Sequence, residues 1–215
     1  MPKVSGAYKA RFKRRILAAA FKEFSKKGYH KANLENVAAS LNVARGTIYL
    51  YFKSKRALFE ALSELQLHHL KVLLERHVWM AGDTAATAME FYLESKLRLP
   101  QNYERMAIEL LAESTRNREL KRERLLEVRK MQQIIVEVFQ DQTGEIIARK
   151  EIREIALGAI ALYNGLQMLK VLGYSDEELK NSWARSISLM IGNKQRDSSS
   201  SPALVNENLI HRRFH

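Results

Sequence analysis

Hydrophobic residues recur every three or four positions along almost the whole chain. This spacing puts them on one face of a helix, and one such stripe consists of Ile16, Leu17, Ala20, Phe21 and Phe24. No segment alternates apolar and polar residues between turn signals, as a half-buried strand would. Proline, the strongest helix breaker, occurs only at positions 2, 100 and 202. The pattern therefore predicts an all-α protein.

Glycines mark where these helices end, because glycine readily adopts the left-handed backbone that often follows a helix. The candidate stops are Gly28, Gly144, Gly173 and Gly192. Ser175 and Glu178 have the spacing of a capping box at the start of the last helix. The pattern predicts helices over residues 8–27, 34–41, 45–51, 54–80, 84–98, 101–114, 116–142, 148–172 and 175–191.

Two short helices near the N-terminus have the spacing of a helix-turn-helix. Their apolar positions would form one small core, and they are Leu34, Val37, Ala38, Leu41, Val43, Ile48 and Phe52. Asn42 occupies the turn, where a residue that tolerates positive φ is needed. Because two short helices cannot bury this face alone, we expect helix 8–27 to close a three-helix core.

Positive charge is concentrated in the same part of the chain. Residues 1–60 hold 14 Lys/Arg against 3 Asp/Glu, whereas residues 61–215 hold 22 against 21. Concentrated positive charge is typical of a phosphate-binding surface, because each neutralised phosphate releases counterions. A solvated basic face or a contact with an anionic membrane would account for the charge equally well.

The order of residues across this segment is specific. It contains Gly28-Tyr29, Asn33, Asn42-Val43, Gly46-Thr47-Ile48-Tyr49, Tyr51-Phe52 and Ser54-Lys55. This order resembles the DNA-binding signature of the TetR/AcrR family, and with the first helix the resemblance covers about 50 residues. The chain departs at three positions, with Asn33 for threonine, Asn42 for glycine and Ala44 for serine. The last change removes a hydroxyl that could contact DNA.

The resemblance implies an interface with double-stranded operator DNA, made by Asn33, Ala44, Arg45, Gly46, Thr47, Tyr49, Leu50, Tyr51, Lys53 and Lys55. Tyr49, Tyr51 and Lys55 would reach phosphate oxygens, which fixes register without reading sequence. Asn33 would cap its helix and face a phosphate. For Tyr49 the alternative is an aromatic packed in the core.

Sequence would be read from the exposed side of the second helix. Arg45 can pair with guanine and Thr47 can meet a thymine methyl group, with Leu50 beside them. Basic residues of the first helix would follow the backbone or enter the minor groove, or lie on a solvated helix start, and these are Lys9, Arg11 and Arg14.

The resemblance weakens after about residue 65, where the two last long helices have extensive apolar faces. These faces are formed by Ile152, Ile155, Ala156, Ala159, Ile160, Tyr163, Leu166, Leu169, Leu179, Trp183, Ile187 and Met190. In proteins of the resembled family such helices pair in a four-helix bundle about a two-fold axis. We therefore expect a homodimer that binds a pseudo-palindromic site in successive major grooves.

The helices between these parts are expected to surround an effector pocket. Its candidate lining residues are Met89, Phe91, Tyr92, Met106, Met131, Phe139, Tyr163, Asn164 and Gln167. Each of them could equally be ordinary core, because methionine and aromatic residues at helical spacing usually just pack. The basic run from Arg116 to Arg124 alternates with glutamates and fits a solvated helix face, or a site for an anionic ligand such as an acyl-CoA.

Three regions are therefore expected: a DNA-binding domain at 1–53, an effector-binding and dimerisation domain at 54–192, and a flexible tail at 193–215 with its serine run. The implied function is that of a repressor released by a small hydrophobic or amphipathic effector. The alternative is an architectural DNA-binding protein of the same fold without an effector.

Other classes of function lack their signatures. The chain has no cysteine, and its 6 histidines form no metal motif. It has no glycine-rich phosphate loop and no nucleophile elbow. We therefore expect neither an enzyme nor a cofactor. No apolar run is long enough to span a membrane, and the N-terminus is basic without a signal-peptide core, so a cytoplasmic location is expected.

Overall fold

The computed structural model describes residues 5–77, 79, 83–97, 99, 102–143 and 147–199. Over these residues all regular secondary structure is helical, as predicted, and each expected helix is present. The helices are α1 (Gly6–Lys31), α2 (Leu34–Ser40), α3 (Arg45–Tyr49), α4 (Lys55–Arg76), α5 (Thr84–Leu97), α6 (Tyr103–Ser114), α7 (Arg118–Thr143), α8 (Arg149–Val171) and α9 (Asp176–Ser199).

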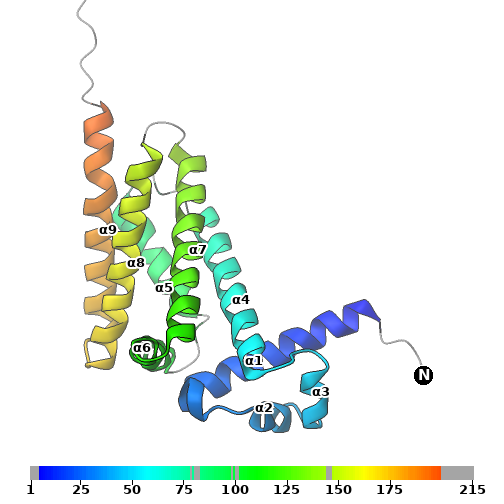
Figure 1. Ribbon diagram of the computed structural model, residues 1–215. Helices are drawn as coiled ribbons and strands as arrows, with labels where there is room; N and C mark the ends of the chain where they lie inside the picture. Colours follow the sequence, from blue (N-terminus) through cyan, green and yellow to red (C-terminus); the bar gives the residue numbers. More distant parts are fainter. Residues whose placement is uncertain are drawn as a thin grey trace, which may run out of the picture.

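Helices α1, α2 and α3 gather at one end of the molecule (Figure 1). Helices α4, α5, α7, α8 and α9 run away from them as a bundle, and α6 lies crosswise where the two parts meet (Figure 1). The chain therefore places its basic N-terminal helices beyond the base of a long helical body.

Three helices end four or more residues away from their expected ends. Helix α1 continues past Gly28, which has φ of 76°, to Lys31, and α4 ends at Arg76 instead of residue 80. The candidate stop Gly144 lies outside the described residues.

The prediction that Gly192 ends α9 was wrong, because the helix continues to Ser199. A single glycine costs a helix interior only about 1 kcal/mol and does not stop it alone. Residues 193–199 of the expected tail are thus helical, and residues 200–215 lie outside the described residues.

The start of α9 has the predicted capping box. The backbone N–H of Ser175 donates to Glu178 Oε2 at 2.9 Å, and the backbone N–H of Glu178 donates to Ser175 Oγ at 3.2 Å. The Ser175 hydroxyl also donates to Glu178 Oε2, at 2.6 Å. This hydrogen bond and the one from the Ser175 N–H lower the pKa of Glu178. The local sequence therefore determines where α9 begins.

The first hydrophobic cluster joins α1, α2 and α3 to the body. Its core includes Ile16, Phe24, Val37, Ile48 and Leu58, all at most 2% exposed. Further buried members come from the body, beyond the domain boundary expected at residue 53, and they are Phe59, Leu62, Met106, Leu110 and Leu120. The predicted three-helix core exists, and α4, α6 and α7 complete it.

The turn between α2 and α3 has the backbone conformation that the sequence predicted. Asn42 has φ of 54°, and the N–H of Val43 donates to the carbonyl of Ala38 at 3.1 Å. Asparagine enters this left-handed region at lower cost than most other residues that carry a Cβ. The turn fixes the angle at which α3 leaves α2.

We predict that Asn42→Val lowers the free energy of unfolding by about 1–2 kcal/mol, because a β-branched residue is strained at positive φ. Asn42→Gly should change it by less than about 0.5 kcal/mol. Urea unfolding followed by far-UV circular dichroism measures both. Equal losses for the two variants would mean that the backbone conformation at Asn42 is not the stabilising feature.

Candidate functional site

The helix-turn-helix is held to α1 by polar contacts as well as by its core. Asn33 caps α2, since its Oδ1 accepts a hydrogen bond from the N–H of Asn36 at 2.8 Å. The amide of Asn36 then donates to Glu23 Oε1 of α1 at 2.6 Å. The capping role expected of Asn33 is confirmed, and α2 is fixed to α1 at its first turn.

One face of α3 is buried and the opposite face is open. Ile48 is fully buried in the first cluster, whereas Tyr49 is 39% exposed and Leu50 is 83% exposed. A Cβ built on Gly46 would meet no atom within 4 Å. Another surface could therefore approach α3 closely along this face, and the packed-core alternative for Tyr49 does not hold.

Arg45 is folded back over α3. Its Nη2 donates to the Tyr49 hydroxyl at 2.9 Å, and its guanidinium lies 5.3 Å from the Tyr49 ring centroid. It also forms an ion pair with Glu35 of α2. The Tyr49 hydrogen bond and the Glu35 charge together raise the pKa of Arg45. To contact a base, Arg45 would have to exchange these partners.

Lys55 has a structural role in this conformation. Its Nζ donates to the carbonyls of Tyr29 at 2.9 Å, His30 at 3.1 Å and Ala32 at 3.2 Å, which closes the end of α1. Partial burial lowers the pKa of the Lys55 ammonium. Lys55 thereby ties the start of α4 to the end of α1.

The remaining candidates for DNA contact differ in exposure. Tyr51 is half-buried, with its ring 5.4 Å from that of Phe12, and Thr47 is also half-buried. The candidates that are exposed are Asn33, Ala44, Arg45, Gly46, Tyr49, Leu50 and Lys53. Exposed basic residues continue along the first part of α1 as Lys9, Arg11, Lys13, Arg14 and Arg15. The structure thus brings α3 and a cationic helix to the same end of the molecule (Figure 1).

Lys53 and Lys55 form a matched pair for a test. We predict that Lys53→Ala leaves stability unchanged and reduces the salt slope of duplex binding by about 1, because an exposed lysine on this surface would neutralise one phosphate. Lys55→Ala should lower the free energy of unfolding by about 1 kcal/mol or more, because three carbonyls lose a charged donor. Fluorescence anisotropy across a salt series and urea unfolding separate the two effects. A loss of stability in Lys53→Ala but not in Lys55→Ala would contradict the structural role of Lys55.

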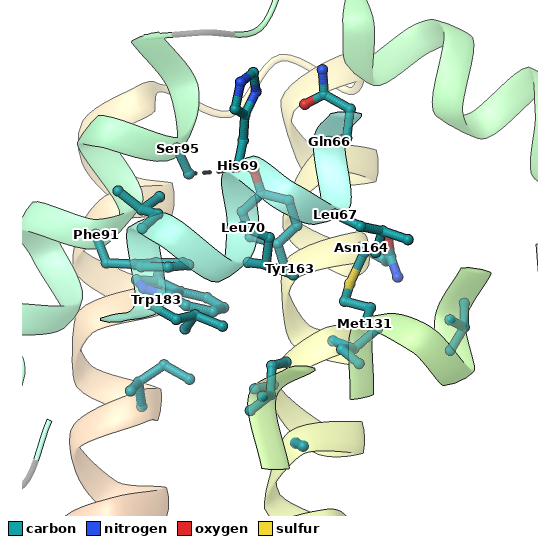
Figure 2. Close-up of a pocket in the computed structure, with 18 of the residues that line it drawn as sticks. Gln66, Leu67, His69, Leu70, Phe91, Ser95, Met131, Tyr163, Asn164 and Trp183 are labelled. Atoms are coloured by element: carbon teal, nitrogen blue, oxygen red, sulfur yellow. Dashed lines mark hydrogen bonds between the residues drawn. The ribbon is translucent and has the colours of Figure 1, made fainter. Parts of the chain in front are cut away.

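The second hydrophobic cluster contains a cavity of about 210 Å³ among α4 to α9. Its walls are mainly aliphatic and aromatic (Figure 2). Tyr163 lies at its centre, with Gln66, His69 and Ser95 on one side and with Phe91 and Trp183 on another (Figure 2). Ser95 Oγ and the Tyr163 hydroxyl are 3.4 Å apart.

Most of the predicted lining residues border this cavity, namely Phe91, Met131, Phe139, Tyr163, Asn164 and Gln167. Three do not. Met106 is buried in the first cluster against Ser25, and Tyr92 is buried between Tyr163 and Trp183. Met89 packs on the second cluster without reaching the cavity. Helical spacing identified these residues as inward-facing but not which interior each one faces.

Sequence reasoning missed other lining residues, including Leu67, Leu70, Leu74, Trp79 and Tyr103. The apolar stripe of residues 67–74 was a signal for α4. Nothing in the sequence pointed to Trp79 or Tyr103, which lie near helix ends.

Charged groups at the cavity are paired with one another. Arg124 forms an ion pair and hydrogen bond with Glu127, and Arg76 pairs with Glu94 at 2.8 Å. Burial raises the pKa of Glu127, and Arg124 opposes that shift. The other basic residues of the run, such as Arg116 and Lys121, are exposed and do not line the cavity.

Tyr103 of α6 contacts both parts of the molecule. It lines the cavity, and its ring meets Phe21 of α1 edge-on with centroids 5.8 Å apart. Burial raises the pKa of the Tyr103 hydroxyl. The next helical positions of α6 divide in the same way, with Ala107 at the cavity and Met106 and Leu110 in the first cluster.

The outer face of α8 and α9 carries apolar side chains outside the set found in the sequence. Ile152, Ile160, Leu166 and Trp183, which belong to the apolar faces found in the sequence, are buried within their own chain. A different row of apolar side chains is exposed, with Leu157, Met168, Leu172 and Leu189 each at least 51% exposed. Helices α8 and α9 lie side by side at the edge of the body (Figure 1).

The described part of the chain has no helix that is long and apolar enough to cross a membrane. It also brings no three His, Asp or Glu side chains together in a way that could hold a metal ion.

Known proteins share the fold and the N-terminal sequence. Residues 16–62 match the family described as bacterial regulatory proteins, tetR family. The chain is 43% identical over 70 residues to the HTH-type transcriptional regulator YvdT of Bacillus subtilis, covering 32% of this chain and 34% of that protein. It is 30% identical over 102 residues to the HTH-type transcriptional repressor Rv1474c of Mycobacterium tuberculosis, covering 46% of this chain and 54% of that protein.

The chain thus spans about a third to a half of these relatives. The solved structure of Salmonella enterica GusR superposes with a TM-score of 0.65 at 21% identity, covering 90% of this chain and 99% of that one. At this identity the likeness concerns the fold alone.

Proposed function

The chain belongs to the TetR family of helix-turn-helix regulators, which are not enzymes, and from this we propose that it is a transcriptional repressor. It would bind a pseudo-palindromic operator as a homodimer and be released by a small effector in the C-terminal cavity. The observation that carries the proposal is the open face of α3, with Gly46, Tyr49 and Leu50 free above a buried Ile48.

The charge distribution supports DNA as the partner. Exposed lysines and arginines of α1 lie at the same end of the molecule as α3 and would contact phosphates, whereas α3 itself would read the bases. The N-terminal 60 residues carry nearly all of the net charge of +12.

Release by an effector is supported by the position of α6. Tyr103 borders the cavity and contacts Phe21 of α1, so a ligand that displaces Tyr103 also acts on the DNA-binding end. A ligand shifts the balance between two conformations only as far as its affinities for them differ. The relevant quantity is therefore the change in duplex affinity on ligand addition.

The DNA proposal is tested with the full chain and a library of genomic fragments in gel-shift titrations. We predict sequence-selective binding that weakens about tenfold in Tyr49→Phe, because a phosphate contact would lose its hydroxyl. Lys121→Ala, on the exposed side of α7, is the matched control and should bind normally. Failure to bind any duplex at low salt would overturn the proposal.

Metabolite and drug extracts are then added to the protein–DNA complex. Their effect distinguishes a repressor released by an effector from an architectural DNA-binding protein without one. An extract that releases the DNA supports a sensing repressor. If no extract alters the shift although the DNA is bound specifically, the architectural alternative is the better account.

The proposed dimer would use the exposed apolar row of α8 and α9. We predict that Met168→Glu weakens dimerisation by at least about tenfold and lowers duplex affinity with it, because an unpaired carboxylate would be buried at the interface. Leu125→Glu, at a 48% exposed position of α7, is the control. Sedimentation equilibrium measures both variants. An unchanged dimer for Met168→Glu would place the interface elsewhere.

A further inference from the structure

The arginine and glutamate side chains that line the cavity are neutralised by one another. There are four of them, and they form two ion pairs, Arg76 with Glu94 at 2.8 Å and Arg124 with Glu127. The nearby Lys96 does not line the cavity, and its Nζ is bound to Glu104 Oε1 at 2.8 Å and Gln167 Oε1 at 2.7 Å. An ionised ligand would thus find no free opposite charge among these groups.

An unpaired ion in such a place is costly. Moving a charged group from water into an apolar site without a partner is unfavourable by several kcal/mol. To gain a partner, an anion would have to take an arginine from its glutamate, and a cation would have to take a glutamate from its arginine. The cost is greater at the Arg124–Glu127 pair, whose side chains are 26% and 16% exposed, because the group left behind there is largely buried.

Uncharged polar groups also line the cavity. Gln66, Ser95, Tyr163 and Asn164 offer amide and hydroxyl groups (Figure 2), and most of the remaining lining consists of rings and aliphatic side chains such as Phe91 and Ile187. Amides and hydroxyls can both donate and accept hydrogen bonds. They would orient an uncharged polar group without needing a counter-ion.

We propose that the effector is an electrically neutral amphiphile, with an apolar body and one uncharged oxygen-bearing group such as a hydroxyl, ester or amide. This inference rests on the proposed sensory role of the cavity. It makes an acyl-CoA, whose head group carries phosphates, the wrong class of ligand for this site.

The chain offers a direct readout of occupancy. Both of its tryptophans, Trp79 and Trp183, line the cavity, and they are 2% and 4% exposed. A ligand that enters the cavity therefore contacts an indole ring. Tryptophan fluorescence then measures binding without any DNA.

The test uses three probes with the same ten-carbon chain: decanol, decanoate and decyltrimethylammonium. The titrations are run near neutral pH, where the carboxylate is ionised. The two ionic probes are kept below their micelle concentrations, and decanol is kept below its solubility limit. We expect decanol to bind at least about tenfold more tightly than either ion. Equal or tighter binding of either ion would overturn the proposal, and so would the absence of a response to all three probes.

Two variants of the same ion pair test the cause. Glu127→Gln leaves Arg124 without its partner and should shift the preference towards decanoate by about tenfold. Arg124→Gln leaves a carboxyl group that ionises to meet a cation, and it should shift the preference towards decyltrimethylammonium. Glu75→Gln, in the exposed pair of Lys71 with Glu75 at 3.8 Å, is the control and should change nothing.

A variant is used only if far-UV circular dichroism shows that it has the helix content of the original protein. If one of the two variants does not fold, the other is sufficient for the test. Unchanged selectivity in a folded variant contradicts the role of the Arg124–Glu127 pair. Duplex affinity is measured separately by anisotropy without probe. A protein that binds DNA but prefers an ion refutes only the neutral effector, whereas one that prefers decanol but ignores DNA refutes only the proposed regulator.

Discussion

The packing of α6 against α1 is the interaction on which the rest of the structure depends. Helices α2 and α3 are too short to hold their positions alone, and the core beneath them is completed by Met106 and Leu110 of α6. The adjacent face of the same helix carries Tyr103 and Ala107 to the cavity. The core of the DNA-binding end therefore shares α6 with the wall of the cavity. A shift of α6 at the cavity must be accommodated by the packing of α1, and the reverse also holds.

The distribution of charge at the DNA-binding end assigns different roles to α1 and α3. Cations on α1 are exposed and can neutralise phosphates, which supplies affinity without selectivity. Helix α3 carries a single cation, Arg45, and that one is bound to Glu35 and Tyr49. Sequence reading at Arg45 would thus begin with an exchange of partners, in which guanine replaces a carboxylate. The cost of that exchange favours a site that offers Arg45 two hydrogen bonds over one that offers none.

Local signals in the sequence predicted much of this fold, and long-range packing did not follow from them. Asn42 and the Ser175–Glu178 box act within a few residues, so their turn and cap could be recognised directly. Met106 shows the limit, because helical spacing marks it as buried but cannot say whether it faces the cavity or α1. Helical spacing also grouped Ile160 with the apolar face of α8, but it did not identify Leu157, which is exposed. The pairing of Arg124 with Glu127 was visible as a spacing, yet its place at the cavity was not.

The energy available for regulation is bounded by what the cavity can bury. Burial of about 100 Å² of additional apolar ligand surface stabilises a complex by roughly 2.5 kcal/mol, which corresponds to about a 70-fold change in an equilibrium. Only the part of that energy realised in one conformation and not in the other can displace DNA. A ligand that merely fills space beside Trp183 would bind without signalling. A ligand that contacts Tyr103 has a further effect, because the Tyr103 ring also packs on Phe21 of α1. The affinity for such a ligand would therefore depend on the position of α1.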